Sequence, residues 1–288
     1  MFIYIWYFDI IWLILRMLWG DYVTNRPKIG LALGSGSARG MAHIGVIKAL
    51  EENGINIDMV SGSSAGALIG GLYCSGIRPD MIRKLAVQID KKLWMDFSVP
   101  RRGIVKGDKI EEILKIITGN KNIEDLDKEL SIVATDLYNA KEIVFTSGPI
   151  YRAIRASISI PGFFEPVEHE GILLVDGGVV DRVPISVLKD NGADIVIAVD
   201  VGFSDYNSRV FHLLDIMQQS IDVMAKRILE ADKIYADVIL EPTLSHIDSS
   251  EFERVEECAE IGYNCANEKI DEIINIINNY EKKHLNED

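Results

Sequence analysis

Cysteine and histidine are scarce in this sequence, and positive charge is not in excess. The three cysteines, Cys74, Cys258 and Cys265, form no Cys-x-x-Cys pair, and the five histidines are dispersed. We therefore expect neither a disulfide framework nor a metal site, and no cofactor. The net charge of −14 at pH 7 argues against a nucleic-acid partner. So few cysteines suit a reducing compartment, so we expect a cytoplasmic protein.

Proline and glycine occur at ordinary levels, with 8 and 23 residues in a chain of 288, of which 48% is hydrophobic. This composition is typical of one large or two small globular domains rather than of a low-complexity chain. The expected organisation is an apolar N-terminal segment with a linker at 1–26, a catalytic domain at 29–189, and a continuation of the sheet with C-terminal helices at 190–288.

The first twenty residues are apolar and rich in aromatic side chains. Their length matches the roughly 20 residues needed to cross a bilayer, but Asp9 and Arg16 oppose a span, each costing on the order of 3 kcal/mol at a helix centre. A secretory signal is disfavoured, because there is no basic leading region and no small-residue cleavage site. Two interpretations stay open. Residues 1–20 associate with a membrane, or translation begins at Met17 and residues 1–16 are a gene-start artefact.

After a polar linker, the chain alternates between short apolar runs and helical patterns. Residues 29–33 predict a strand, 41–53 a helix, 57–60 a second strand and 65–74 a second helix. This order predicts a parallel sheet with right-handed crossovers, with sites at the carboxyl ends of the strands. The remaining expected helices are 79–89, 109–117, 149–156, 210–229 and 252–280, and the remaining expected strands are 130–136, 142–146, 172–175, 195–201 and 237–240. Residues 281–288 are charged and are expected to fray.

Residues 91–109 differ in composition from the rest of this acidic chain, because basic side chains are mixed there with aromatic and apolar ones without strong periodicity. Such a segment suits a flap over a site or a surface that touches anionic lipid. It equally suits a solvated connector whose aromatic side chains plug the core.

The central motif is Gly62-x-Ser64-x-Gly66, which lies between an expected strand and an expected helix. This spacing is typical of a nucleophile elbow, in which a serine lies on a sharp turn and the glycines let backbone pass close by. The following helix directs its free N–H groups toward the serine oxygen, which favours developing negative charge. Taken alone, the motif equally fits a serine N-cap in a small-residue turn.

A glycine-rich turn follows the first expected strand and contains Gly34, Gly36, Ser37, Arg39 and Gly40. Its backbone N–H groups are expected at the same sheet edge as the serine, where they can form an oxyanion hole. Arg39 adds a cation that can hold a phosphate or carboxylate.

A dinucleotide-binding turn is the competing interpretation of the glycine-rich segment. It requires an acidic residue at the carboxyl end of the second strand, and Asp58 lies at the opposite end. We therefore favour the oxyanion hole.

Asp176 ends the expected strand at 172–175 and is followed by Gly177 and Gly178, so its carboxylate can approach the serine unobstructed. The histidines fit a catalytic role poorly. His212 and His246 lie in or beside helical segments, His284 lies in the tail, and His43 is one turn into a helix, where it supports the glycine loop. A serine–aspartate dyad is favoured over a triad.

These motifs, in this order, resemble the patatin-like phospholipases, in particular a short bacterial branch related to the catalytic domain of neuropathy target esterase. The resemblance covers about residues 28–270, and the 157–167 stretch and Asp181-x-x-Pro184 contribute to it. One departure is that Ser35 and Ser37 interrupt the glycine loop, where many members carry consecutive glycines.

The resemblance implies a three-layer α/β/α sandwich with a mainly parallel central sheet. It also implies a serine hydrolase of lipid acyl esters (phospholipase, lysophospholipase or esterase), with Ser64 as nucleophile, Asp176 as base, and an acyl-enzyme intermediate. The expected partners are a lipid ester substrate and a membrane surface touched through 1–20 or 91–109. The alternative is a non-catalytic or regulatory lipid-binding protein on the same fold.

Overall fold

The computed structural model describes residues 26–88, 96, 102–202 and 213–285. The apolar segment 1–20 and the part of the 91–109 patch before Arg102, apart from Asp96, lie outside the described residues, so the expectations placed on them stay predictions. Within the described ranges, no helix combines the length and apolar composition needed to cross a bilayer.

A central sheet organises the molecule, with the strand order β10-β9-β1-β2-β4-β8-β7 and β5 paired to β4. Its pairs from β10 to β4 are parallel, whereas β8, β7 and β5 are antiparallel to their neighbours. The strands of this sheet are β1 (Ile29–Leu33), β2 (Met59–Ser63), β4 (Glu129–Asp136), β5 (Lys141–Phe145), β7 (Val167–His169), β8 (Ile172–Asp176), β9 (Ile195–Val199) and β10 (Val238–Leu240). A separate ribbon pairs β3 (Gly103–Val105) with β6 (Gly162–Phe164).

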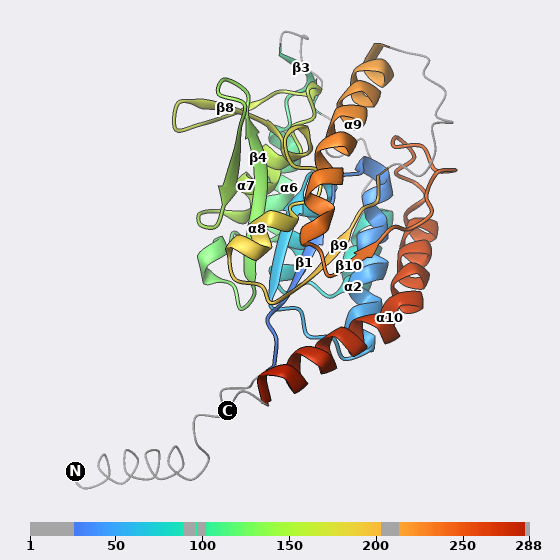
Figure 1. The fold of residues 1–288 in the computed structure, drawn as a ribbon. Helices are drawn as coiled ribbons and strands as arrows, with labels where there is room; N and C mark the ends of the chain where they lie inside the picture. Colours follow the sequence, from blue (N-terminus) through green and yellow to red (C-terminus); the bar gives the residue numbers. More distant parts are fainter. Residues whose placement is uncertain (1–25, 89–95, 97–101, 203–212, 286–288) are drawn as a thin grey trace, which may run out of the picture.

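Helices cover both faces of the sheet (Figure 1). They are α2 (Ala42–Glu52), α3 (Ala65–Cys74), α4 (Pro79–Gln88), α6 (Asp108–Ile117), α7 (Ile150–Ser157), α8 (Ile185–Asp190), α9 (Leu213–Asp232) and α10 (Val255–Leu285), with short 3₁₀ helices η1 (Ser37–Met41), η2 (Ile123–Asp125), η3 (Gly177–Val179) and η4 (Lys233–Tyr235).

Alternation along the strands divides the core into two layers. Leu31 and Leu33 of β1 join the large cluster formed with α2, α3, α7 and α10. Ala32, between them, faces the smaller cluster formed with α8 and Leu229 of α9. Both faces of β1 are therefore buried, which explains its uninterrupted apolar sequence. The chain has the expected three-layer α/β/α architecture with a mainly parallel sheet.

The helices and strands predicted from the sequence are present in the structure with small shifts at their ends. The C-terminal residues differ from the prediction. The charged tail was expected to fray from residue 281, but α10 continues to Leu285. Tyr280 and His284 stack with ring centroids 4.1 Å apart, and His284 Nδ1 bonds to the Tyr280 carbonyl oxygen at 2.9 Å. These contacts one turn apart extend the helix beyond its apolar stripe.

Candidate active site

Ser64 occupies the sharp turn between β2 and α3. Its backbone angles, φ 53° and ψ −117°, lie in a region that non-glycine residues rarely adopt, at a cost of about 1–3 kcal/mol. The flanking glycines are needed because backbone passes close by. A Cβ on Gly66 would lie 1.9 Å from the Leu33 carbonyl oxygen, and one on Gly62 would lie 2.6 Å from the Gly66 carbonyl. The surrounding fold therefore holds the serine in a strained turn.

The Ser64 hydroxyl donates to the carboxylate of Asp176, with 2.5 Å between Oγ and Oδ2. Asp176 ends β8, and its other oxygen, Oδ1, accepts the Gly178 N–H at 2.8 Å. Its main chain is fixed on both sides, because its N–H donates to the Ser159 carbonyl and its carbonyl accepts the Thr135 hydroxyl. Both Ser64 and Asp176 are buried. Two residues far apart in the sequence thus form a short, well-oriented hydrogen bond.

Burial raises the pKa of Asp176 to about 7, although the hydrogen bonds from Ser64 and Gly178 act in the opposite direction. An ordinary aspartate, with a pKa of about 3.9, is a poor acceptor for an alcohol proton. The environment brings this carboxyl close to the pKa that suits a general base at neutral pH.

The glycine loop between β1 and η1 runs beside Ser64. The N–H groups of Gly34 and Ser35 donate to the carbonyls of Val199 and Arg182. Among the described residues, the N–H groups of Gly36 and Ser37 have no acceptor, and both residues line a cavity wall together with Ser64. Two backbone donors are thus available for an oxyanion next to the serine.

His43 lies behind this loop rather than beside the serine. Its Nε2 is 2.7 Å from the Gly34 carbonyl oxygen, so Nε2 carries the proton and donates. The ring is completely buried, and burial lowers its pKa to about 4, which keeps the imidazole neutral. His246 instead pairs with Glu257 at the surface, and His212 lies outside the described residues. Within the described chain, Asp176 is the side chain that contacts the Ser64 hydroxyl.

Two cavities adjoin Ser64. The larger, of about 500 Å³, is walled mainly by apolar side chains of α3, α4 and α6 and by Ile158, Ile160 and Phe164. The 157–167 stretch therefore contributes to a pocket. The smaller, of about 30 Å³, is polar and is lined by Ser64, Asp176 and Arg39, among others. That volume is sufficient for a water molecule.

Arg39 was expected to hold an anion at this site. In the structure, part of its side chain is instead bonded to the protein itself. The side chain is buried, and its Nε donates to the Ile247 carbonyl oxygen at 2.7 Å. Burial lowers the pKa of Arg39, and the charges of Asp222 and Asp248 act in the opposite direction. One part of the guanidinium therefore anchors the loop, while the side chain also lines the polar cavity.

Sequence reasoning missed Ser157, whose Oγ accepts the Ser64 N–H at 2.9 Å. It also missed Arg155, a buried guanidinium that donates to the carbonyls of Lys106, Gly107 and Glu165 and to the Ser159 hydroxyl. A signal was present, since buried polar side chains must find partners. Serine at 157 and 159 within an otherwise apolar stretch indicates that these hydroxyls have hydrogen-bond partners, but the sequence does not show which groups they are.

Similarity to known proteins identifies the family of this chain. A family model described as Patatin-like phospholipase matches residues 31–189. An uncharacterized NTE family protein of Mycobacterium bovis is 42% identical over 185 residues, covering 63% of this chain and 51% of that protein. The lysophospholipase NTE1 of Scheffersomyces stipitis is 30% identical over 276 residues, covering 85% of this chain and 18% of that protein.

Among solved structures, VipD from Legionella pneumophila shares the fold, with a TM-score of 0.62 at 17% identity over 86% of this chain and 67% of that one. The chain spans about half the length of the mycobacterial relative and under a fifth of the yeast one. The matched segment contains the glycine loop, Ser64 and Asp176. This chain belongs to the patatin-like phospholipase family.

Proposed function

We propose that this chain hydrolyses lipid acyl esters, with Ser64 as nucleophile and Asp176 as general base. The observation that carries the proposal is the 2.5 Å hydrogen bond between Ser64 Oγ and Asp176 Oδ2, beside an apolar cavity of about 500 Å³. Membership of the patatin-like phospholipase family and the lysophospholipase name of the yeast relative support a lipid substrate.

In the acylation step, Ser64 Oγ forms a bond to the ester carbonyl carbon while its proton passes to Asp176 Oδ2. The carbonyl oxygen becomes an oxyanion that accepts hydrogen bonds from the N–H groups of Gly36 and Ser37. One such donor typically contributes roughly 3 kcal/mol. The bond to the leaving alcohol then breaks, and Asp176 returns the proton to the departing oxygen.

In the deacylation step, water attacks the acyl-enzyme and passes its proton to Asp176. The polar cavity of about 30 Å³ next to Ser64 and Asp176 is a suitable place for that water. The released carboxylic acid leaves Ser64 with its proton restored from Asp176. A pKa of about 7 lets the same carboxyl accept and return protons near neutral pH.

The larger cavity is the proposed site of the acyl chain. Its walls include Leu68, Leu72 and Ile82, and Ser64 and Ser37 also line it. Burying each methylene there would contribute about 0.8 kcal/mol. The substrate class that fits best is therefore an ester whose acyl part is a long hydrocarbon chain.

A fluorophosphonate probe and a lipid digest test this proposal together. We expect the probe to label Ser64, and we expect mixed phospholipids and lysophospholipids to release fatty acid with wild type but not with Ser64→Ala or Asp176→Asn. Ser75→Ala, which removes a hydroxyl bonded only within the turn after Gly71, should retain activity. If the folded protein binds lipid but neither reacts with the probe nor releases fatty acid, the proposed hydrolysis is wrong and the protein is a non-catalytic lipid-binding protein.

A further inference from the structure

Residues 244–251 hold the glycine loop through two hydrogen bonds. The Ala38 N–H donates to the Ser249 carbonyl at 3.1 Å, and Arg39 Nε donates to the Ile247 carbonyl at 2.7 Å. Ala38 and Arg39 are buried and directly follow the two N–H groups that have no acceptor within the described chain. The direction of those two donors therefore depends on where residues 244–251 lie.

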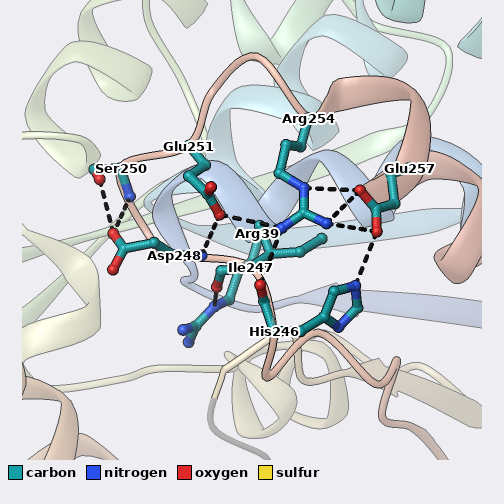
Figure 2. Close-up of polar contacts among 8 residues, drawn as sticks. All are labelled: Arg39, His246, Ile247, Asp248, Ser250, Glu251, Arg254 and Glu257. Carbon is teal, nitrogen blue, oxygen red and sulfur yellow. Dashed lines mark hydrogen bonds and ion pairs between the residues drawn. The ribbon is translucent and has the colours of Figure 1, made fainter. Parts of the chain in front are cut away.

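Arg254 holds this segment in place from the side opposite Arg39 (Figure 2). Its Nη1 donates to the His246 carbonyl at 3.0 Å and to Glu251 Oε2 at 3.2 Å. Glu251 Oε2 also accepts the Asp248 N–H at 2.7 Å. One guanidinium thus fixes both ends of the turn whose carbonyls bind the glycine loop.

Glu257, on the first turn of α10, in turn fixes Arg254, which directly precedes that helix. The two side chains form a bidentate pair, with Arg254 Nε and Nη2 each 2.7 Å from a Glu257 oxygen. His246 Nε2 bonds to the same carboxylate at 2.9 Å. These partners hold the pKa of Glu257 below its usual value. The fork geometry sets the direction of the remaining Arg254 donors, which a lysine could not do.

Helix α10, which begins directly after Arg254 and carries Glu257, is packed directly on α2, the helix that follows the glycine loop. A Cβ on Gly45 of α2 would lie 1.8 Å from the Ala259 carbonyl oxygen, and a Cβ on Gly262 would lie 2.0 Å from the Ala42 carbonyl oxygen. The two backbones are therefore in close contact on both sides of the crossing. The helix that follows Arg254 and the helix that follows the glycine loop are thus in direct contact.

We infer that Arg254 is a positioning residue for the oxyanion donors, acting through the His246 and Ile247 carbonyls on Arg39 and so on Gly36 and Ser37. This inference rests on the proposed function for its catalytic consequence. Arg254 lies beyond the segment matched by the family model, which ends at residue 189. Arg254 is not itself among the residues that line the two cavities beside Ser64, although its neighbours Glu253 and Val255 line the larger one. We therefore expect its loss to act more on the transition state than on substrate binding.

The first test compares Arg254→Met and Glu257→Gln with Lys269→Met. The control removes an ion pair of the same (i,i+3) spacing farther along α10, between Lys269 and Glu272. With nitrophenyl butanoate we expect kcat to fall about 10-fold in both test variants, with KM within twofold of wild type, and no change in the control. Unchanged kcat in both test variants would overturn the inference, as would a loss that appears only in KM.

The second test is a double-mutant cycle that combines Arg254→Met with Arg39→Met and compares kcat of the two single variants with that of the double variant. If Arg254 acts through Arg39, the double variant should be no slower than the slower single variant, within about twofold. Rate losses that multiply would contradict this route.

Hydrogen exchange provides a readout that does not need activity. In Arg254→Met we expect faster exchange of the backbone amides in residues 34–40, where the Ala38 N–H loses its fixed acceptor, but wild-type exchange in α3. Unchanged exchange in 34–40 would contradict the inference even in an inactive protein. Conversely, faster exchange in a protein whose wild type shows no Ser64-dependent hydrolysis would reject the proposed function and retain the positioning role.

Discussion

The Ser157 hydroxyl oxygen accepts the backbone N–H of Ser64 at 2.9 Å, and both residues are buried. This contact fixes the strained serine turn from the end of α7. In Ser157→Ala the Ser64 N–H loses its acceptor, which should cost about 1–3 kcal/mol of stability. We also expect kcat to fall by about tenfold, since the serine then departs from its orientation toward Asp176. Urea unfolding and ester kinetics measure the two effects.

Ser75→Ala is the matched control for that change. Ser75 is also a buried serine, but its hydroxyl donates to the Gly71 carbonyl one turn back at the end of α3. We expect a stability loss below about 1 kcal/mol and wild-type kcat. Equal effects of the two substitutions would show that the Ser64 N–H does not depend on Ser157.

The rate should rise with pH, with a midpoint near 7. Asp176 acts as a base only when ionised, and burial raises its pKa to about 7, so the active fraction grows as the pH passes through that value. The measurement is kcat/KM for nitrophenyl butanoate between pH 5 and 9. His169→Gln, which removes an imidazole of β7 outside both cavities, should keep the same midpoint. A flat profile from pH 5 to 9 would contradict a base with this pKa.

Asp176→Asn should stabilise the protein at alkaline pH. The folded-state pKa of about 7 lies above the unfolded value of about 3.9. The ionised carboxylate therefore opposes folding above pH 7, and this penalty is lost as the pH falls through 7 toward 4. We expect a gain on the order of 2–4 kcal/mol at pH 8 that shrinks by pH 5. Urea unfolding at the two pH values measures it.

Asp127→Asn removes an exposed carboxyl and serves as the control for the stability experiment. We expect its unfolding free energy to differ from wild type by the same small amount at pH 8 and pH 5. If Asp176→Asn is less stable than wild type at pH 8, then the buried carboxylate is compensated by its hydrogen bonds and its pKa is not raised.

Sequence motifs were sufficient to bring together Ser64, Asp176 and the glycine loop, because each follows a strand whose apolar run is unmistakable. The carboxyl ends of the parallel strands β1 and β2 must meet at one edge, so the glycine loop and Ser64 belong to one site. Asp176 ends the antiparallel β8, whose direction alone would carry it to the opposite edge. It reaches Ser64 because β8 pairs with the last residues of β4, Ala134 to Asp136, which continue past the end of β2. That relationship depends on sheet order, which no local pattern encodes.

The residues that support the site could not be predicted in this way. Ser157 and Arg254 act on Ser64 and on the glycine loop across large sequence separations, and their own surroundings look like ordinary helix ends. The raised pKa of Asp176 arises from burial, which is a property of the packed fold. The ordinary aspartate pKa, which is all that the sequence offers, applies to a solvated carboxyl and not to this buried one.

Acyl-chain preference should follow the volume of the apolar cavity. We expect kcat/KM for nitrophenyl esters to rise with chain length by up to about fourfold per methylene, the equivalent of ~0.8 kcal/mol, until the cavity of about 500 Å³ is filled. Ile113 of α6 lines this cavity, so Ile113→Trp should lower kcat/KM for the dodecanoyl ester while that for the butanoyl ester stays within about twofold of wild type. The readout is the ratio of the two values.

Ile116→Trp places the same bulk on the same helix outside the cavity, since Ile116 is 79% exposed. We expect the wild-type ratio of dodecanoyl to butanoyl kcat/KM in this control. If Ile113→Trp also keeps that ratio, the acyl chain lies elsewhere, although the Ser64–Asp176 chemistry would stand. If both esters slow equally in Ile113→Trp, the substitution has disturbed Ser64 itself rather than reduced the space for the acyl chain, because a smaller cavity should slow the longer ester more than the shorter one.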